Sequence, residues 1–296
     1  MNHAPVLYDE VLRFLKPETG RAFLDATTDG GGHARGIMEA MPRDAIFVGI
    51  DRDKTMVDRL SREFSNDGRV RLIVGNFRDL QQITRRFADS FDGILFDLGM
   101  SSIQLEDSGR GFSFQKDEPL LMTYESEPEE GRETAAVIVN GWTESDIAEI
   151  LKKYGEERFA RPIARAIVTA RKQKRITTTQ ELVRVIEEAV PARYRHGRLH
   201  PATRTFQALR IAVNDELEAL AKGLEGAMTV LAPGGRLVVI AFHSLEDRTV
   251  KNFLRDSARD NKGVVLTKKP VVALEAEVRS NPRSRSAKLR AFIRNP

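Results

Sequence analysis

The residues best placed to do chemistry lie at the ends of two apolar, strand-like runs. The first run covers residues 22–26, and a glycine turn follows it, with Gly30, Gly31, Gly32 and His33 in succession. The second run covers residues 46–50 and closes on Asp51. In an open α/β sheet, ligands lie beyond the carboxyl ends of the strands, where glycine lets the backbone approach and an acidic residue binds a ribose diol. These signals predict one nucleoside-binding site.

The spacing of the glycines indicates which nucleoside the site suits. A dinucleotide fingerprint reads G-x-G-x-x-G. Gly30 and Gly32 match its first two positions, but Arg35 stands at the third, and His33 lies where a pyrophosphate needs bare backbone. The turn therefore suits an adenosyl ligand without a pyrophosphate better than NAD. A tight turn that binds nothing is the alternative, and Asp51 argues against it.

Three further predicted strands bring side chains to the same edge of the sheet. They cover residues 70–74, 91–98 and 236–241, and they lead to Phe77, Asp97 and His243 with Ser244. Asp51 would accept from both ribose hydroxyls, and Phe77 would lie against a purine face or offer its backbone N–H to the purine edge. The glycines would admit an amino-acid group. The set predicts a site for S-adenosylmethionine (SAM).

Asp97 and His243 are the candidate catalytic residues. Methyl transfer from a sulfonium is an in-line displacement, so the enzyme mainly supplies proximity and alignment. An exocyclic amine is a weak nucleophile, and a carboxylate that accepts its N–H bonds interacts more strongly as charge develops. Asp97 could do this, hold the methionine amine or cap the next segment. His243 could act as an acid or base, contact RNA or cap a helix.

The order of the predicted elements indicates a domain with an insertion. Strands alternate with helices up to residue 98, which is typical of a mostly parallel sheet. Residues 143–189 predict helices alone, and the alternation returns at residue 217. We expect a doubly wound, Rossmann-like α/β domain at residues 1–129 and 206–296. An inserted all-helical subdomain for substrate recognition would cover residues 130–205.

Composition limits the class of protein. The chain has 296 residues and no cysteine, which excludes disulfides and thiolate metal sites. No apolar run approaches the roughly 18 residues of a membrane span, and the N-terminus does not read as a signal peptide. We therefore expect a cytoplasmic protein that binds neither a membrane nor a metal.

Basic residues gather in three segments, although the formal net charge is only +4. Seven Lys/Arg lie in 158–175, five in 193–210 and six in 279–294, and none of these segments contains an acidic residue. Any one of them could be a solvated surface. Together they favour a polyanionic partner, and we expect RNA.

Motifs along nearly the whole chain resemble one known family, the bacterial small-subunit rRNA cytosine-N4 methyltransferases (the RsmH or MraW family). The matching motifs include His3-x-Pro5-Val6-Leu7, Asp25-x-Thr27, Gly31-Gly32-His33, Ile50-Asp51-Arg52-Asp53, Phe96-Asp97-Leu98-Gly99-x-Ser101-Ser102-x-Gln104, Arg110-Gly111-Phe112-Ser113-Phe114, Tyr154 to Ala160, His200 to Arg210 and Phe242-His243-Ser244-Leu245-Glu246-Asp247-Arg248. The two blocks Tyr154–Ala160 and His200–Arg210 are the most specific.

The resemblance implies an activity and a set of site residues. It implies SAM-dependent methylation at N4 of a cytidine in the decoding region of 16S rRNA, and we expect this rRNA to be bound within the small ribosomal subunit. It also implies a methyltransferase sheet with a helical insertion. By matching position, it assigns SAM to Gly31, Gly32, His33, Asp51, Phe77, Asp97 and Gln104.

The chain departs from the family pattern in two places. The family usually has glycine where Asp29 stands, and Asp-Met-Arg where this chain has Leu121, Met122 and Thr123. These departures keep open a non-catalytic, RNA-binding assembly factor. A nicotinamide-dependent oxidoreductase is the remaining alternative, and the missing third glycine argues against it.

Overall fold

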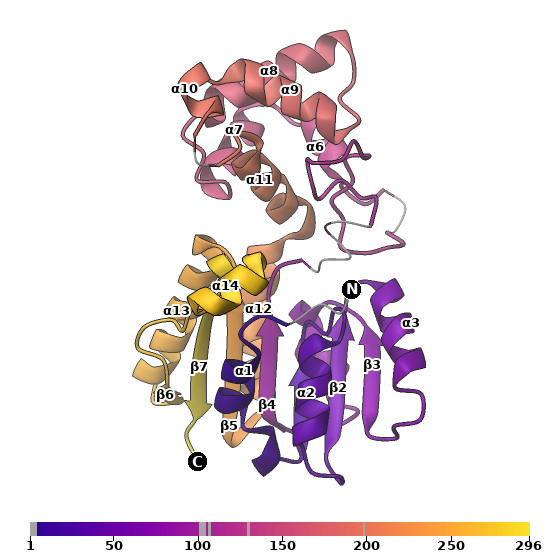
Figure 1. Ribbon diagram of the computed structural model, residues 1–296, viewed down its shortest axis with the longest axis vertical. Helices are drawn as coiled ribbons and strands as arrows, with labels where there is room; N and C mark the ends of the chain where they lie inside the picture. Colours follow the sequence, from indigo (N-terminus) through magenta and orange to yellow (C-terminus); the bar gives the residue numbers. More distant parts are fainter. Residues whose placement is uncertain (1–4, 101–104, 106–107, 129–130, 198) are drawn as a thin grey trace. The chain divides into compact units, whose positions relative to one another are not determined.

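The structure is a computed structural model that describes residues 5–100, 105, 108–128, 131–197 and 199–296. The chain forms two compact units (Figure 1). One combines Met1–Gly99 with Leu217–Pro296 and contains the β-sheet, and the other is Met100–Glu216 and is helical. The helical unit is therefore inserted into the sequence of the sheet unit.

Within the described residues, the strands form one seven-stranded sheet of order β3-β2-β1-β4-β5-β7-β6. The neighbours among β1 to β5 pair in parallel, and β7 pairs antiparallel with both β5 and β6. This confirms the predicted doubly wound α/β class. The strands are β1 (Ala22–Asp25), β2 (Ile46–Asp51), β3 (Val70–Val74), β4 (Phe91–Asp97), β5 (Leu231–Ala241), β6 (Gly263–Val265) and β7 (Lys288–Arg294).

Side chains along each central strand alternate between two cores, one on each face of the sheet. Phe23 and Leu95 pack into one cluster with residues of α1 and α2, whereas their neighbours Leu24 and Phe96 pack into another with residues of α12 and α13. A strand that is buried on both faces reads as a continuous apolar run. The apolar runs in the sequence are therefore explained by helices on both faces (Figure 1).

Helices follow β1, β2, β3 and β5 in the sheet unit. Asp53 caps α3 by accepting the Thr55 N–H at 3.0 Å. The α14 helix was not predicted. The helices are α1 (Tyr8–Leu15), α2 (Gly32–Ala40), α3 (Lys54–Glu63), α4 (Leu80–Thr84), α12 (Glu216–Val230, which begins one residue before the unit), α13 (Ser244–Arg259) and α14 (Glu275–Ser280), with short 3-10 turns η1 (Pro17–Thr19), η2 (Phe77–Asp79) and η3 (Pro282–Ser286).

The start of β5 differs from the prediction. The sequence predicts a tight stop at 232–235 and a strand from residue 236, but β5 already pairs with β4 at Leu231. The register then shifts, so that Gly93 pairs with Arg236. Gly234 has a φ of 75°, and Pro233 and Gly234 are exposed, so the turn residues form an irregularity inside the strand.

The helical unit contains α6 (Ala135–Gly141), α7 (Glu144–Lys153), α8 (Ala160–Gln173), α9 (Thr179–Ala189), α10 (Ala192–Arg195) and α11 (Ala202–Asn214). The helices α7 and α9 begin with capped first turns. Thr143 accepts the Asp146 N–H at 3.2 Å, and Thr178 with Glu181 forms a reciprocal capping box at the start of α9. Such caps satisfy backbone donors that a helix leaves unpaired at its first turn.

The helical unit extends beyond the predicted 130–205 on both sides. Before it, Phe112, Leu120 and Met122 are buried in the same core as the helices. After it, α11 contributes Phe206 and Leu209 to that core. The predicted boundary at residue 205 falls inside α11, whose buried Ala202, Phe206, Leu209 and Val213 recur at helical spacing.

Among the described residues, no helix combines the length and the apolar character needed to cross a lipid bilayer.

Candidate cofactor and active site

The predicted site residues of the sheet unit gather at one edge of the sheet. Because β1 to β4 pair in parallel, Asp25, Asp51 and Asp97 lie at strand ends that face the same way. Hydrogen bonds join these ends directly. The Asp97 N–H donates to Thr27 Oγ1 at 2.6 Å, and the Asp29 N–H donates to Asp51 Oδ2 at 2.7 Å. The turn after β1 is thus tied to the ends of both β2 and β4.

The glycine turn needs its glycines for conformation and for space. Gly31 is the N-cap of α2 and has a φ of 77°, in the left-handed region. A Cβ at Gly31 would lie 2.6 Å from Leu60 Cδ2. At Gly32 the same atom would lie 3.0 Å from Pro5 Cβ. A turn without side chains lets a ligand approach the first backbone N–H groups of α2, where a carboxylate is favoured by the helix dipole.

Asp29 occupies this turn in a conformation that usually selects glycine. Its φ is 45°, and aspartate is among the few other residues that adopt the left-handed region readily. Its backbone N–H is one of the two that hold Asp51. The departure from the family pattern therefore leaves the backbone of the turn in place, and its effect lies in the added carboxylate.

Asp51 is held by backbone donors on both of its oxygens. Oδ2 accepts from Asp29 at 2.7 Å, and Oδ1 accepts from the Asp53 N–H at 2.8 Å. Each carboxylate oxygen has a second lone pair, so a ribose diol can still donate to both. Burial raises the pKa of Asp51 to about 7, and the Asp29 carboxylate adds to the rise. This carboxylate therefore changes charge near neutral pH.

A buried cluster of three titratable side chains lies beneath the turn. His33 Nε2 is 3.3 Å from Asp97 Oδ2, and the side chains of Asp25 and His33 are 1% and 5% exposed. Burial raises the pKa of Asp25 to about 7, against the Thr27 N–H and His33, which lower it. Burial lowers the pKa of His33, but Asp97 and Asp25 outweigh this and leave it raised. The two carboxyl groups therefore favour the protonated form of His33, and burial opposes it.

Asp97 retains an acceptor atom for a ligand. Its side chain is 25% exposed, and Oδ2 faces His33. Its Oδ1 is buried and has no hydrogen-bond partner among the described residues. An unpaired buried acceptor costs about 1–3 kcal/mol, which a bound N–H donor would recover. The turn without side chains, the diol acceptor Asp51 and this free oxygen together fit an adenosyl group whose amino-acid end carries a carboxylate and an ammonium group.

Phe77 begins the turn after β3, as predicted, but its ring packs inward. The ring meets Phe96 edge to face with centroids 5.6 Å apart. On α12, a Cβ at Gly223 would lie 2.8 Å from Phe77 Cδ2. Of the two roles predicted for Phe77, this packing favours the one in which its backbone N–H meets the purine edge.

His243 caps the helix that follows β5. Its Nδ1 accepts the Glu246 N–H at 3.4 Å, and Glu246 Oε2 accepts from the Phe242 and His243 N–H groups at 2.8 and 3.2 Å. Its Nε2 lies 3.2 Å from Glu246 Oε1. Among the described residues, the His243 side chain contacts this glutamate and not Asp97. The capping alternative is therefore the one with direct contacts, and a catalytic role for His243 stays a prediction.

Three further residues of the matching motifs are Gln104, Asp25 and Thr27. Gln104 lies outside the described residues. The motif Asp25-x-Thr27 predicts no role for either residue, but in the structure they join the turn to β4 and to His33. The available signal was a carboxylate that ends an otherwise apolar strand, as Asp51 and Asp97 do.

The second departure from the family pattern lies in the helical unit. Thr123 is fully buried and donates to the Glu125 carbonyl at 3.2 Å. Arg110, 8% exposed, donates to the carbonyls of Thr123 and Tyr124 at 3.1 and 2.6 Å. A guanidinium from Arg110 thus lies against this segment, where the family pattern has a cation in the segment itself.

In the third basic segment, 279–294, several cations make contacts within the sheet unit, although the sequence predicts that the segment binds RNA. Arg290, only 5% exposed, donates to Asp247 at 2.6 Å, and Lys288 lies 3.5 Å from the same carboxylate. Arg294 donates to the carbonyls of Met228 and Leu231. These cations are engaged within the sheet unit, which weakens the case that this segment binds RNA.

The sheet order, the glycine turn after β1 and the carboxylate after β2 define the class of SAM-dependent methyltransferases. The family model described as "MraW methylase family" matches residues 1–295, and the chain belongs to that family. It is a SAM-dependent methyltransferase by fold and family. The nicotinamide-dependent alternative is thereby set aside.

Curated relatives extend along the whole chain. A protein of Persephonella marina named "Ribosomal RNA small subunit methyltransferase H" is 46% identical over 296 residues, covering 99% of each chain. One of Synechococcus elongatus with the same name is 48% identical over 291 residues, covering 98% of this chain and 93% of the relative. A solved structure described as a putative rRNA-methylase from Clostridium thermocellum is 12% identical, with a TM-score of 0.47, and covers 99% of this chain and 100% of that one.

Proposed function

We propose that this protein transfers a methyl group from SAM to the N4 amine of a cytidine in the decoding region of 16S rRNA. The observation that carries the proposal is full-length similarity, at 46–48% identity, to proteins named for methylation of small-subunit ribosomal RNA. The polar edge of the sheet supplies the chemistry that such a reaction requires.

When bound, SAM supplies an electrophilic methyl group on a sulfonium. We assign its ribose to Asp51 and its amino-acid end to the turn at Gly31 and Gly32. Asp97 then has one oxygen fixed near His33 and the other free to accept an N–H. That free oxygen would accept from the methionine amine or from the N4 amine of cytidine, where the interaction strengthens as nitrogen gains positive charge. Attack by N4 at the methyl carbon would break the carbon–sulfur bond and release S-adenosylhomocysteine, and the proton lost from N4 would pass to solvent.

The helical unit supplies the surface that we assign to RNA. It contains two of the three basic segments, 158–175 and 193–210. An enzyme that acts on a base edge must take the base into its pocket, and unpaired RNA offers such bases. We place the reaction in the cytoplasm, on rRNA within the small subunit, and Gln104 in the cofactor site by its matching position.

The test is transfer of labelled methyl from SAM to unmethylated small subunits and to the same rRNA free of protein. Digestion to nucleosides and mass spectrometry should place the label on N4 of a single cytidine. Asp97→Asn is the matched variant, since it keeps the size of the side chain and replaces the free carboxylate oxygen. We expect it to lose at least about 100-fold in methyl transfer, within the range for removing one electrostatic contact in a transition state.

Three outcomes separate the alternatives. Label on another atom or on the large-subunit rRNA would reject the proposed substrate. SAM binding without transfer to either acceptor would indicate a non-catalytic assembly factor. Transfer to assembled subunits but not to protein-free rRNA would show that the basic surfaces recognise a folded ribosomal substrate.

A further inference from the structure

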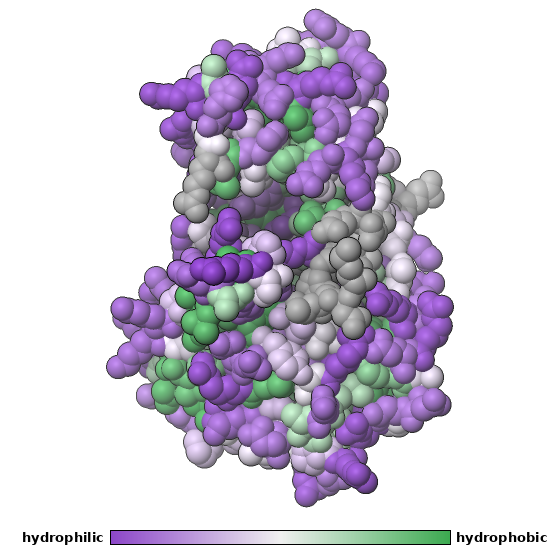
Figure 2. Space-filling view, in the orientation of Figure 1, coloured by the Kyte–Doolittle hydropathy of each residue, from purple (hydrophilic) through white to green (hydrophobic). Residues whose placement is uncertain are grey.

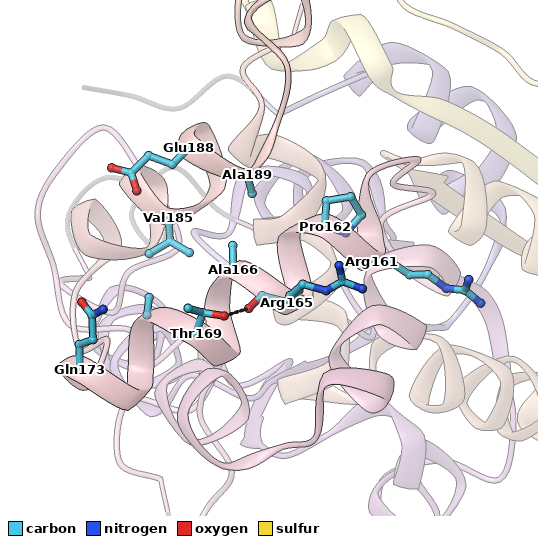
Figure 3. A pocket seen from close by; sticks show the side chains of 10 residues that line it. Arg161, Pro162, Arg165, Ala166, Thr169, Gln173, Val185, Glu188 and Ala189 are labelled. Atoms are coloured by element: carbon cyan, nitrogen blue, oxygen red, sulfur yellow. Dashed lines mark hydrogen bonds between the residues drawn. The ribbon is translucent and has the colours of Figure 1, made fainter.

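A groove runs between α8 and α9 inside the helical unit (Figure 3). It encloses about 560 Å³, within the roughly 300–1,000 Å³ of ligand sites. Its floor is made of small or apolar side chains, and its rim is polar. The floor residues are Pro162, Ala166, Ala170, Val185 and Ala189. Small side chains on adjoining helices leave this space open, so the groove is a consequence of the alanines on facing turns.

Two arginines form the α8 rim of the groove. Figure 3 shows the guanidinium groups of Arg161 and Arg165 extending in the same direction from α8, while the Glu188 carboxylate projects from α9 away from them. Arg161 makes no hydrogen bond or ion pair among the described residues. Arg165 has one acidic neighbour, Glu144 at 3.5 Å, and both side chains are well exposed. Exposed pairs of this kind are worth about 0–1 kcal/mol and are readily exchanged.

Other cations of the same basic segment are already engaged. Arg158 lies over the rings of Phe159 and Tyr194, Arg171 donates to the Val139 carbonyl, and Lys174 pairs with Glu181. Among the described residues, four cations of the segment lie outside such contacts, apart from the exposed Arg165–Glu144 pair: Arg161, Arg165, Lys172 and Arg175. Of these, Arg161 and Arg165 line the groove. The surface over α8 to α10 is largely hydrophilic (Figure 2), consistent with contact to a polar partner.

Three of these cations follow one line along α8. At about 100° per residue, Arg161, Arg165 and Lys172 fall within about 40° of one another on the helix circumference. They span about 16 Å along the helix axis. A line of cations beside a shallow apolar floor matches a single nucleic-acid strand, in which phosphates alternate with base and ribose surfaces.

We infer that the α8–α9 groove binds an unpaired segment of RNA. Phosphates would lie against Arg161 and Arg165, and a ribose or base face would cover the floor at Pro162 and Ala166. Glu188, on the opposite side of the groove, would accept from a 2′-hydroxyl or a base amine. The inference rests on the proposed function for the nature of the polyanion, and it adds a binding site remote in sequence from every cofactor residue.

The first experiment measures binding of a short fluorescein-labelled single-stranded RNA to the full-length protein by anisotropy, over a series of salt concentrations. The test variant is Arg161→Glu with Arg165→Glu. We expect affinity to fall by at least about tenfold, and the slope of log affinity against log salt to fall by about 1.4, since each phosphate contact contributes about 0.7 on a single strand.

The matched control is Lys152→Glu with Arg184→Glu. These two exposed cations belong to the same helical unit, do not line the groove, and give the same change in net charge. An equal loss of affinity in both double variants would overturn the inference, because it would show a general charge effect. Retained affinity in the control supports the groove.

A third variant tests the floor without changing charge. Ala166→Leu fills the groove from α8, and a thermal melt verifies that the unit stays folded. We expect a loss of about tenfold in affinity for the RNA probe, with SAM affinity unchanged. Binding at the parent level in the folded variant would overturn the groove and leave only a charged helix surface. A duplex of the same sequence that binds as tightly as the single strand would also count against it.

Failure of this inference is distinguishable from failure of the proposed function. If the parent protein methylates rRNA and the arginine pair alters neither KM for rRNA nor RNA affinity, the groove is wrong and the function stands. If the parent transfers no methyl group but the arginine pair still lowers RNA affinity, the groove stands and the proposed reaction is wrong.

Discussion

The turns after β1 and β5 lie at the same edge of one sheet, yet they differ in how the first backbone N–H groups of the following helix are capped. After β1, α2 begins at Gly31, which has no side chain to offer to the helix. After β5, α13 begins at His243, which forms a reciprocal capping box with Glu246. The first turn leaves its backbone donors for a ligand, whereas the second satisfies its own.

The carboxyl groups of the two turns differ in the same sense. Asp25 is buried beside a second carboxylate, and burial raises its pKa to about 7. Glu246 is also buried, but it accepts from the N–H groups of Phe242 and His243. The charge of Asp25 therefore lowers the stability of the folded protein, as charges in binding sites often do, whereas the charge of Glu246 stabilises the fold.

The largest effect is expected from Gly31→Ala. A side chain there would overlap Leu60 and hold a left-handed backbone that costs about 1–2 kcal/mol outside glycine. We expect SAM affinity, measured by calorimetry, to fall by about tenfold to a hundredfold as the turn relaxes, at about 1.4 kcal/mol for each factor of ten. Gly234→Ala is the control, because Gly234 has a φ of 75° and no atom within 4 Å of an added Cβ. Equal SAM affinity in both variants would mean that the turn does not bind the cofactor.

The second effect concerns Asp25→Asn and has an unusual sign. The carboxyl titrates near 3.8 when unfolded and near 7 when folded, so the folded state binds the extra proton and the parent loses stability as pH rises between these values. The variant cannot titrate there. Urea unfolding gives the free energy of unfolding of both proteins. The value for the variant minus the value for the parent should rise by about 2–3 kcal/mol between pH 5 and pH 8, at about 1.4 kcal/mol per pKa unit. A gap that stays constant with pH would show that Asp25 is ionised throughout.

The third effect is a pH dependence of SAM binding through Asp51. A ribose diol donates hydrogen bonds and so favours the carboxylate, whose pKa is about 7 in the free protein. Binding should therefore tighten as pH rises from 6 to 8, by up to about tenfold, as the deprotonated fraction grows. Calorimetry at each pH tests this. Asp51→Asn should bind SAM more weakly and without that dependence, and an unchanged pH profile in the variant would assign the titration to another group.

The smallest effect is expected from Glu246→Gln in the turn after β5. Loss of a charged cap should lower the free energy of unfolding by about 1 kcal/mol, with SAM affinity unchanged. The measurements are urea unfolding and calorimetry on the same sample. A loss of SAM affinity comparable with that of Gly31→Ala would remove the contrast between the two turns and favour a functional role for His243.

Much of the sheet could be predicted from the sequence because its strands are buried on both faces. Residues 46–51 form a strand with the predicted bounds, since a continuous buried apolar run leaves few alternatives. Residues 70–74 also form the predicted strand, although β3 is only partly buried. The start of β5 could not be predicted, because Pro233 and Gly234 carry turn signals that the strand absorbs as an exposed irregularity. The start of the insertion could not be predicted, because Leu120 and Met122 belong to its core but lie in a segment without helical periodicity.

The candidate site divides along a similar line. Its strand-end carboxylates could be predicted, because position in a parallel sheet fixes their edge. Their contacts could not. That His33 faces Asp97, or that Thr27 joins β1 to β4, depends on side-chain directions that spacing does not specify. The packing of Phe77 against Phe96 likewise depends on α12, which lies far along the chain.

The insertion of the helical unit between β4 and α12 has a consequence for biosynthesis. During translation, β4 emerges with its β1 side ready to pair, but the strand for its other side, β5, is made only after the whole helical unit. Pairings between distant segments form slowly, and an unpaired strand edge can associate with other chains. The emerging half-sheet must therefore wait, with one edge open, until residues 231–241 arrive, and the helical unit can complete its own core during that interval.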